Sequence, residues 1–85
     1  MIFSFTIDKP NDISATFKTL QTRAKKFKAT LTGNEKAGNV SFNGVHGNYV
    51  LDEDVIRVNV LKKTLPIPNK LIEMEIRAIF RDASK

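Results

Sequence analysis

Hydrophobic and polar residues alternate through residues 39–61, and this pattern predicts three consecutive antiparallel strands. Asn43-Gly44 favours a type I′ turn, which needs a positive φ at both central positions and would set Phe42 opposite Val45. Residues 52–54 are acidic and mark the next reversal. Because side chains two residues apart share a face, the predicted core face holds Val40, Phe42, Val45, Tyr49, Leu51, Ile56, Val58 and Val60.

The opposite face of these strands is polar, with Val50 as its one apolar exception. Gly47 indicates either a β-bulge or a place where another backbone approaches the sheet closely. The residues expected on this hydrated face are Ser41, Asn43, His46, Asn48, Arg57 and Asn59.

The first part of the chain predicts a strand, a helix and a second, short strand. Residues 2–7 alternate, and residues 29–32 form the short strand, followed by a loop at 33–38. Asn11 or Asp12 is expected to cap the helix between these strands. Apolar residues at helical spacing define its buried side: Ile13, Phe17, Leu20, Ala24 and Phe27.

Residues 69–82 predict a closing helix, with Asn69 as the expected cap and Glu73–Arg77 as an i,i+4 ion pair. Its buried side is expected to hold Leu71 or Ile72, together with Ile76, Ile79 and Phe80. The order is therefore strand, helix, four antiparallel strands and helix. A sheet with one apolar face and two amphipathic helices predicts an α+β fold, in which both helices pack on that face, within one domain over residues 1–85.

Composition excludes several chemistries. The chain has no cysteine, so disulfides, thiolate nucleophiles and cysteine-based metal centres are ruled out. No apolar run is long enough to span a bilayer, and residues 1–8 lack the basic and apolar regions of a signal peptide, so we expect a cytoplasmic protein. With one histidine in the chain, we expect no metal site and no cofactor.

His46 is the one residue with a conceivable catalytic role. It is most simply a solvated strand residue, and the alternative is a general base acting with Ser41 across the hairpin. We therefore expect no enzyme and assign no catalytic residue.

The formal net charge of +5 comes from one segment. Residues 13–34 carry no acidic residue, whereas the rest of the chain balances its charges. The basic residues are Lys18, Arg23, Lys25, Lys26 and Lys28. They form either a solubilising surface or a binding surface for the phosphates of a nucleic acid or an anionic membrane.

Leu65 and Ile67 alternate with prolines in the apolar loop at residues 61–68. Either they pack under the last helix as a hydrophobic staple, or they form an exposed patch that contacts a partner.

Residues 42–61, the apolar loop and residues 71–77 resemble the polyhydroxyalkanoic acid system family of small bacterial proteins. The shared features are the Gly44–Gly47 entry to the meander, the acidic turn and the Ile72-Glu73-Met74-Glu75-Ile76 stretch. The resemblance implies a small cytoplasmic bacterial accessory protein, found in the setting of polyester granules, without assigned catalytic residues.

The leading hypothesis is a non-enzymatic accessory or interaction protein that contacts a protein or granule surface through Leu65 and Ile67, and that self-associates. The alternative is nucleic-acid or anionic-surface binding through the basic first helix.

Overall fold

The computed structural model describes residues 2–26, 28–64 and 66–83 of the chain. It confirms the α+β class and the order of elements. The elements are β1 (Phe3–Asp8), α1 (Ile13–Lys26), β2 (Thr30–Gly33), β3 (Ala37–Phe42), β4 (Val45–Asp52), β5 (Val55–Lys63) and α2 (Asn69–Ala83).

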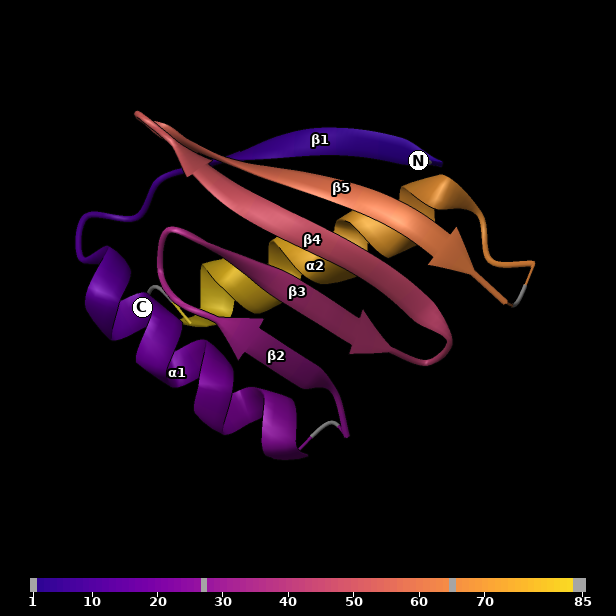
Figure 1. Ribbon diagram of the computed structural model, residues 1–85, viewed down its shortest axis with the longest axis horizontal. Helices are drawn as coiled ribbons and strands as arrows, with labels where there is room; N and C mark the ends of the chain where they lie inside the picture. The colour runs from indigo at the N-terminus through magenta and orange to yellow at the C-terminus, as the bar shows by residue number, and fades with distance from the viewer. Residues whose placement is uncertain (1, 27, 65, 84–85) are drawn as a thin grey trace.

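The five strands form one antiparallel sheet in the order β1-β5-β4-β3-β2. The first strand therefore pairs with the last, which leaves β1 and β2 as the two edges (Figure 1). Both helices pack on the apolar face, because Ile72 and Ile76 of α2 belong to the core cluster and Ile13 and Phe17 of α1 pack against it.

The predicted turn and its register are confirmed. Asn43 and Gly44 have φ angles of 47° and 79°, Phe42 lies opposite Val45, and Val40 lies opposite Gly47. The second reversal is also a tight turn, which pairs Asp52 with Val55.

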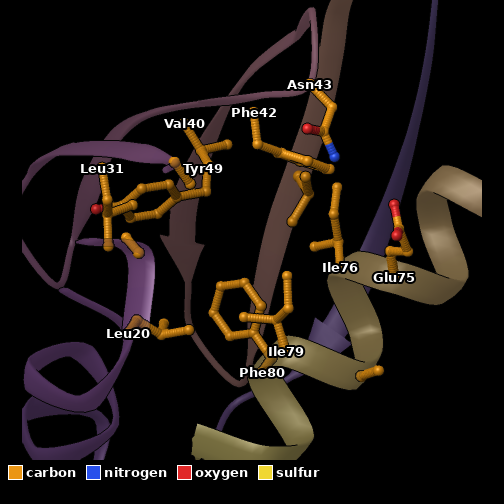
Figure 2. Close-up of a pocket in the computed structure, with 14 residues that line it drawn as sticks. Leu20, Leu31, Val40, Phe42, Asn43, Tyr49, Glu75, Ile76, Ile79 and Phe80 are labelled. Carbon is orange, nitrogen blue, oxygen red and sulfur yellow. The ribbon is translucent and has the colours of Figure 1, made fainter. Parts of the chain in front are cut away.

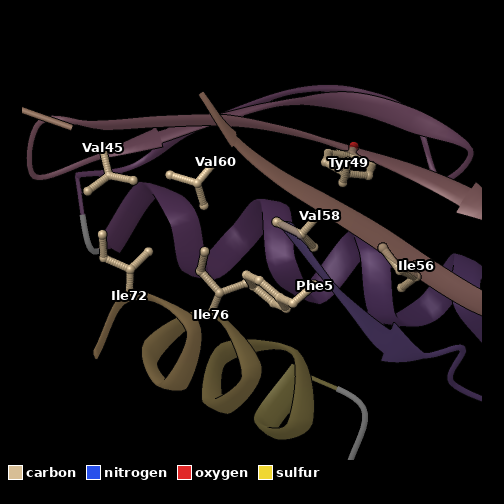
Figure 3. Packing of buried hydrophobic residues seen from close by; sticks show 8 residues of the cluster. All are labelled: Phe5, Val45, Tyr49, Ile56, Val58, Val60, Ile72 and Ile76. Carbon is tan, nitrogen blue, oxygen red and sulfur yellow. The ribbon is translucent and has the colours of Figure 1, made fainter. Parts of the chain in front are cut away.

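The core consists of side chains from β4, β5 and β1, packed against α2 (Figure 3). Val50 is 40% exposed on the opposite face, as its position in the alternation predicts. The fully or nearly buried residues of the cluster are Phe5, Val45, Tyr49, Ile56, Val58, Val60, Ile72 and Ile76.

The loop before β3 is shorter than expected. The backbone N–H groups of Lys36 and Ala37 both donate to Asn34 Oδ1, at 2.8 and 3.1 Å, and the Asn34 N–H donates to the Ala37 carbonyl at 2.9 Å. These bonds form a compact turn, so strand pairing extends to Gly33 opposite Gly38.

One helix cap is confirmed and the other prediction is wrong. Asp12 Oδ1 accepts from the Ala15 N–H at 3.1 Å and caps α1. Asn69 does not cap α2, because its side chain accepts from Lys63 Nζ at 2.8 Å, and the Pro68 carbonyl accepts the first helical N–H groups instead. Ile72, with no exposed surface, is the buried member of its pair, whereas Leu71 is 50% exposed.

Gly47 sits where the β4–β5 register shifts, and both interpretations of this glycine hold. A Cβ atom there would lie 2.6 Å from the Asn59 carbonyl oxygen of β5.

We expect Gly47→Ala to lower the free energy of unfolding by about 1–3 kcal/mol, because the backbone must move to admit the methyl group. Urea titration measures the loss.

The neighbouring His46 provides the control. His46 is exposed, so His46→Ala should change the free energy of unfolding by less than about 0.5 kcal/mol. Equal effects of the two substitutions would contradict the close approach at Gly47.

Candidate functional site

An apolar cleft of about 350 Å³ lies between the two helices, over strands β2, β3 and β4 (Figure 2). One wall comes from α1, the other from α2, and the sheet forms the floor. The side chains that shape it include Leu20, Leu31, Val40, Phe42, Ile76 and Ile79. This volume is within the range of pockets that bind small molecules.

Alanines leave the space open. Ala24 and Ala29 line the α1 side and Ala78 lines the α2 side, where leucine or phenylalanine would fill the gap. Helical spacing predicted Ala24 in the buried stripe of α1 but gave no indication of the cleft. A small residue in the buried stripe of a helix is a weak predictor of a cleft, because the space it leaves can be filled by a side chain of the element that packs opposite.

Two polar side chains also line the cleft. Asn43 belongs to the β3–β4 turn and Glu75 to α2, and Figure 2 shows both on the side away from Leu20 and Leu31. Glu75 is exposed, so its carboxylate remains hydrated beside the apolar walls. The cleft therefore combines an apolar interior with a polar end, an arrangement suited to a ligand with an apolar body and a polar head.

Tyr49 forms part of the floor, and its hydroxyl is already engaged. The hydroxyl donates a hydrogen bond of 2.7 Å to the Asn34 carbonyl, and the Phe17 ring lies 6.2 Å from the Tyr49 ring. Burial raises the pKa of Tyr49 to about 12. The hydrogen bond fixes the turn before β3 to the floor of the cleft.

The apolar loop lies elsewhere. Ile67 is half-buried and packs against the core cluster, as expected for a staple. Lys63 Nζ holds this loop by donating to the Ile67 carbonyl at 2.6 Å. Leu65 lies outside the described residues, and the partner-binding role of Leu65 and Ile67 stays a prediction.

The basic residues of α1 do not share one face. At 100° per residue, Lys18 and Lys25 fall on one line of the helix, whereas Arg23 lies roughly 160° from Lys25. Lys26 falls nearer Arg23, and Lys28 follows the helix with a φ of 57°. Within the described residues, none of these five side chains forms an ion pair.

His46 lies on the outer face opposite Ser41, far from the helix layer. The two residues border a shallow hollow whose other lining side chains include Thr30, Asn39 and Leu61. Among the described residues, no carboxylate lines this hollow. In the part of the chain that the structure describes, no group of three or more histidine, aspartate or glutamate side chains is placed to hold a metal ion.

Comparison with family models, with curated proteins and with solved structures found no match for this chain. Among the described helices, none has the length and apolar character needed to cross a membrane.

Tyr49 is the only tyrosine and the chain has no tryptophan, so its ionisation can be followed by tyrosinate absorbance. We expect a midpoint near pH 12 in the native protein and about 10 in urea. Since the folded-state pKa is raised, the corresponding stability is present below pH 10 and is lost as the pH rises from 10 towards 12.

The Tyr49→Phe variant is the control for this titration. It should lose the part of the pH dependence of stability that falls in that window. A native midpoint near 10 would contradict the burial of the phenol.

Proposed function

We propose that this protein is a non-enzymatic accessory protein that acts by binding, and that the cleft between α1 and α2 receives a single aliphatic chain. The observation that carries the proposal is the apolar cleft itself, whose walls are held open by Ala24, Ala29 and Ala78. The binding site in this proposal is therefore the cleft, in place of the Leu65–Ile67 loop.

The dimensions and the lining support an aliphatic ligand. Each buried methylene contributes about 0.8 kcal/mol, so a chain of several carbons would bind detectably in an apolar cleft of this size. Asn43 and Glu75 at one end would stay in contact with the polar head of the ligand or with water. Lipid acyl chains and aliphatic polyesters share this chemistry, and the resemblance to the polyhydroxyalkanoic acid system family makes a granule surface one setting for it.

The cleft can be filled by mutation. Ala24 lines it and is half-buried, so Ala24→Phe would place an aromatic ring where the chain binds. We expect this variant to lose binding by at least tenfold, measured by calorimetry with 1-octanol, whose neutral head does not repel the Glu75 carboxylate, and with a soluble oligomer of 3-hydroxybutyrate. The probe that binds identifies the source of the chain.

Ala15→Phe is the matched control, because Ala15 is exposed on the same helix and outside the cleft. It should bind like the unmodified protein. If Ala24→Phe keeps its circular dichroism spectrum and binds both probes unchanged, or if the unmodified protein binds neither, the proposal fails.

A second function is favoured by the charge of α1. Lys18, Lys25, Lys26 and Lys28 are exposed and, within the described residues, without an acidic partner. An unneutralised set of cations of this kind is suited to the phosphates of a nucleic acid. Because these cations lie at different angles around the helix axis, only those on one side of α1 can contact a flat nucleic-acid surface at the same time.

We expect weak binding to a short DNA duplex, with an affinity that falls steeply with salt. Replacing Lys25, Lys26 and Lys28 by Glu should abolish binding in a fluorescence anisotropy titration. The control replaces Lys9, Lys36 and Lys70, all exposed, by Glu, and so changes the net charge equally. Equal losses in both variants would indicate a general charge effect and not a site on α1.

A further inference from the structure

Strand β1 is an open edge of the sheet. It is outermost in the strand order and pairs with β5 over its whole length, from Phe3 opposite Val60 to Asp8 opposite Val55. The other edge, β2, is shorter and contacts α1. Figure 1 shows β1 running along one side of the sheet with no further element beyond it.

From Phe3 to Ile7, strand β1 lacks the features that usually protect an edge from pairing. Natural edge strands carry lysine, proline or a bulge, or are very short. The sequence Phe-Ser-Phe-Thr-Ile-Asp has no basic residue and no proline, and Asp8 at its end is its one charge. Its register with β5 is regular from Phe3 to Asp8, and the one offset lies before it, where the Ile2 N–H donates to the Val60 carbonyl at 2.8 Å. The edge is therefore able to accept another strand.

The backbone groups that point outward can be assigned. The Lys9 N–H donates to the Asp54 carbonyl at 2.9 Å, which continues the β1–β5 register as a hydrogen-bonded pair. Hydrogen-bonded and non-hydrogen-bonded pairs alternate along an antiparallel ladder. Counting back from Lys9, the backbone groups of Phe3, Phe5 and Ile7 therefore bond to β5. Ser4, Thr6 and Asp8 then direct their N–H and C=O groups away from the sheet.

The strand is complementary to itself. Residues 3–7 read apolar, polar, apolar, polar, apolar around Phe5. When two such strands run antiparallel about Phe5, Ser4 of one faces Thr6 of the other, and these are the residues with open backbone groups. Phe3 then faces Ile7 of the second copy on the helix side, and Phe5 faces Phe5, so apolar side chains meet apolar side chains and hydroxyls meet hydroxyls.

We propose that two copies of this chain pair through β1 in antiparallel orientation, with a twofold axis at Phe5, and form one continuous sheet. Pairing would also cover Ile2, which is 40% exposed at the start of this edge. A cyclic twofold assembly is closed, so the edge is used once and no fibre results. This inference is independent of the ligand that the cleft binds.

Sedimentation velocity over a concentration series tests the proposal. The unmodified protein should convert from monomer to a species of twice the mass. Thr6→Pro removes an outward N–H group that the second copy would bond to, so the variant should stay monomeric. It should still fold, because no bond to β5 is lost and Phe5, the residue before the proline, already has the extended backbone that proline requires there. Thr6→Val keeps the N–H and should dimerise like the unmodified protein.

Hydrogen exchange of the unmodified protein gives a second readout that needs no variant. The amides of Ser4 and Thr6 should become at least tenfold more protected as the concentration rises through the dimer range, while exposed turn amides such as that of Glu53 do not change. A protein that stays monomeric at every concentration would overturn the proposal. So would a dimer that persists in Thr6→Pro, or one that leaves both edge amides unprotected, because another surface would then hold the two copies together.

Discussion

The turn between β3 and β4 sets the register of the hairpin, and this register decides which side chains of the sheet face the helices. Asn43 and Gly44 both adopt positive φ, and the turn pairs Phe42 with Val45. A slip of one residue would turn Val45 and Tyr49 towards water and His46 and Asn48 towards the helices. The end of β5 is attached to the same turn, since the Thr64 N–H donates to the Gly44 carbonyl at 3.0 Å.

The helix layer follows from that register, and the cleft follows from the helix layer. One face of the sheet is apolar throughout its centre, so both helices pack there. Ile72 and Ile76 fill the space over β4 and β5, but the stretch over β2 and β3 is flanked by alanines from both helices. The space that remains is the site we propose for an aliphatic chain, with Tyr49 as a rigid part of its floor.

The two edge strands of the sheet differ in how they are protected from pairing with another strand. Thr30–Gly33 forms a short edge beside α1, whereas Phe3–Asp8 forms a longer edge that has no lysine or proline and carries its one charge, Asp8, at its end. The cations of α1 keep part of the surface strongly hydrated. A hydrated helix, an apolar cleft and an open sheet edge are the surfaces on which the proposals above rest.

The local features of the fold could be predicted from the sequence. Alternation identified the core face from Val40 to Val60, the Asn43-Gly44 pair identified the turn, and helical spacing placed Leu20 and Ile76 inward. These predictions succeeded because each depends on residues that are near one another in the chain, where periodicity and turn geometry act directly.

Contacts between separate elements could not be predicted from the sequence. The pairing of β1 with β5, the engagement of Asn69 by Lys63, and the cleft between Ala24 and Ala78 each join residues from separate elements. Asparagine is a common helix cap, but the side chain of Asn69 accepts a charge-assisted hydrogen bond from the Lys63 ammonium group instead. Local pattern carries no information on which element lies opposite another, and that is why the site became visible only in the folded chain.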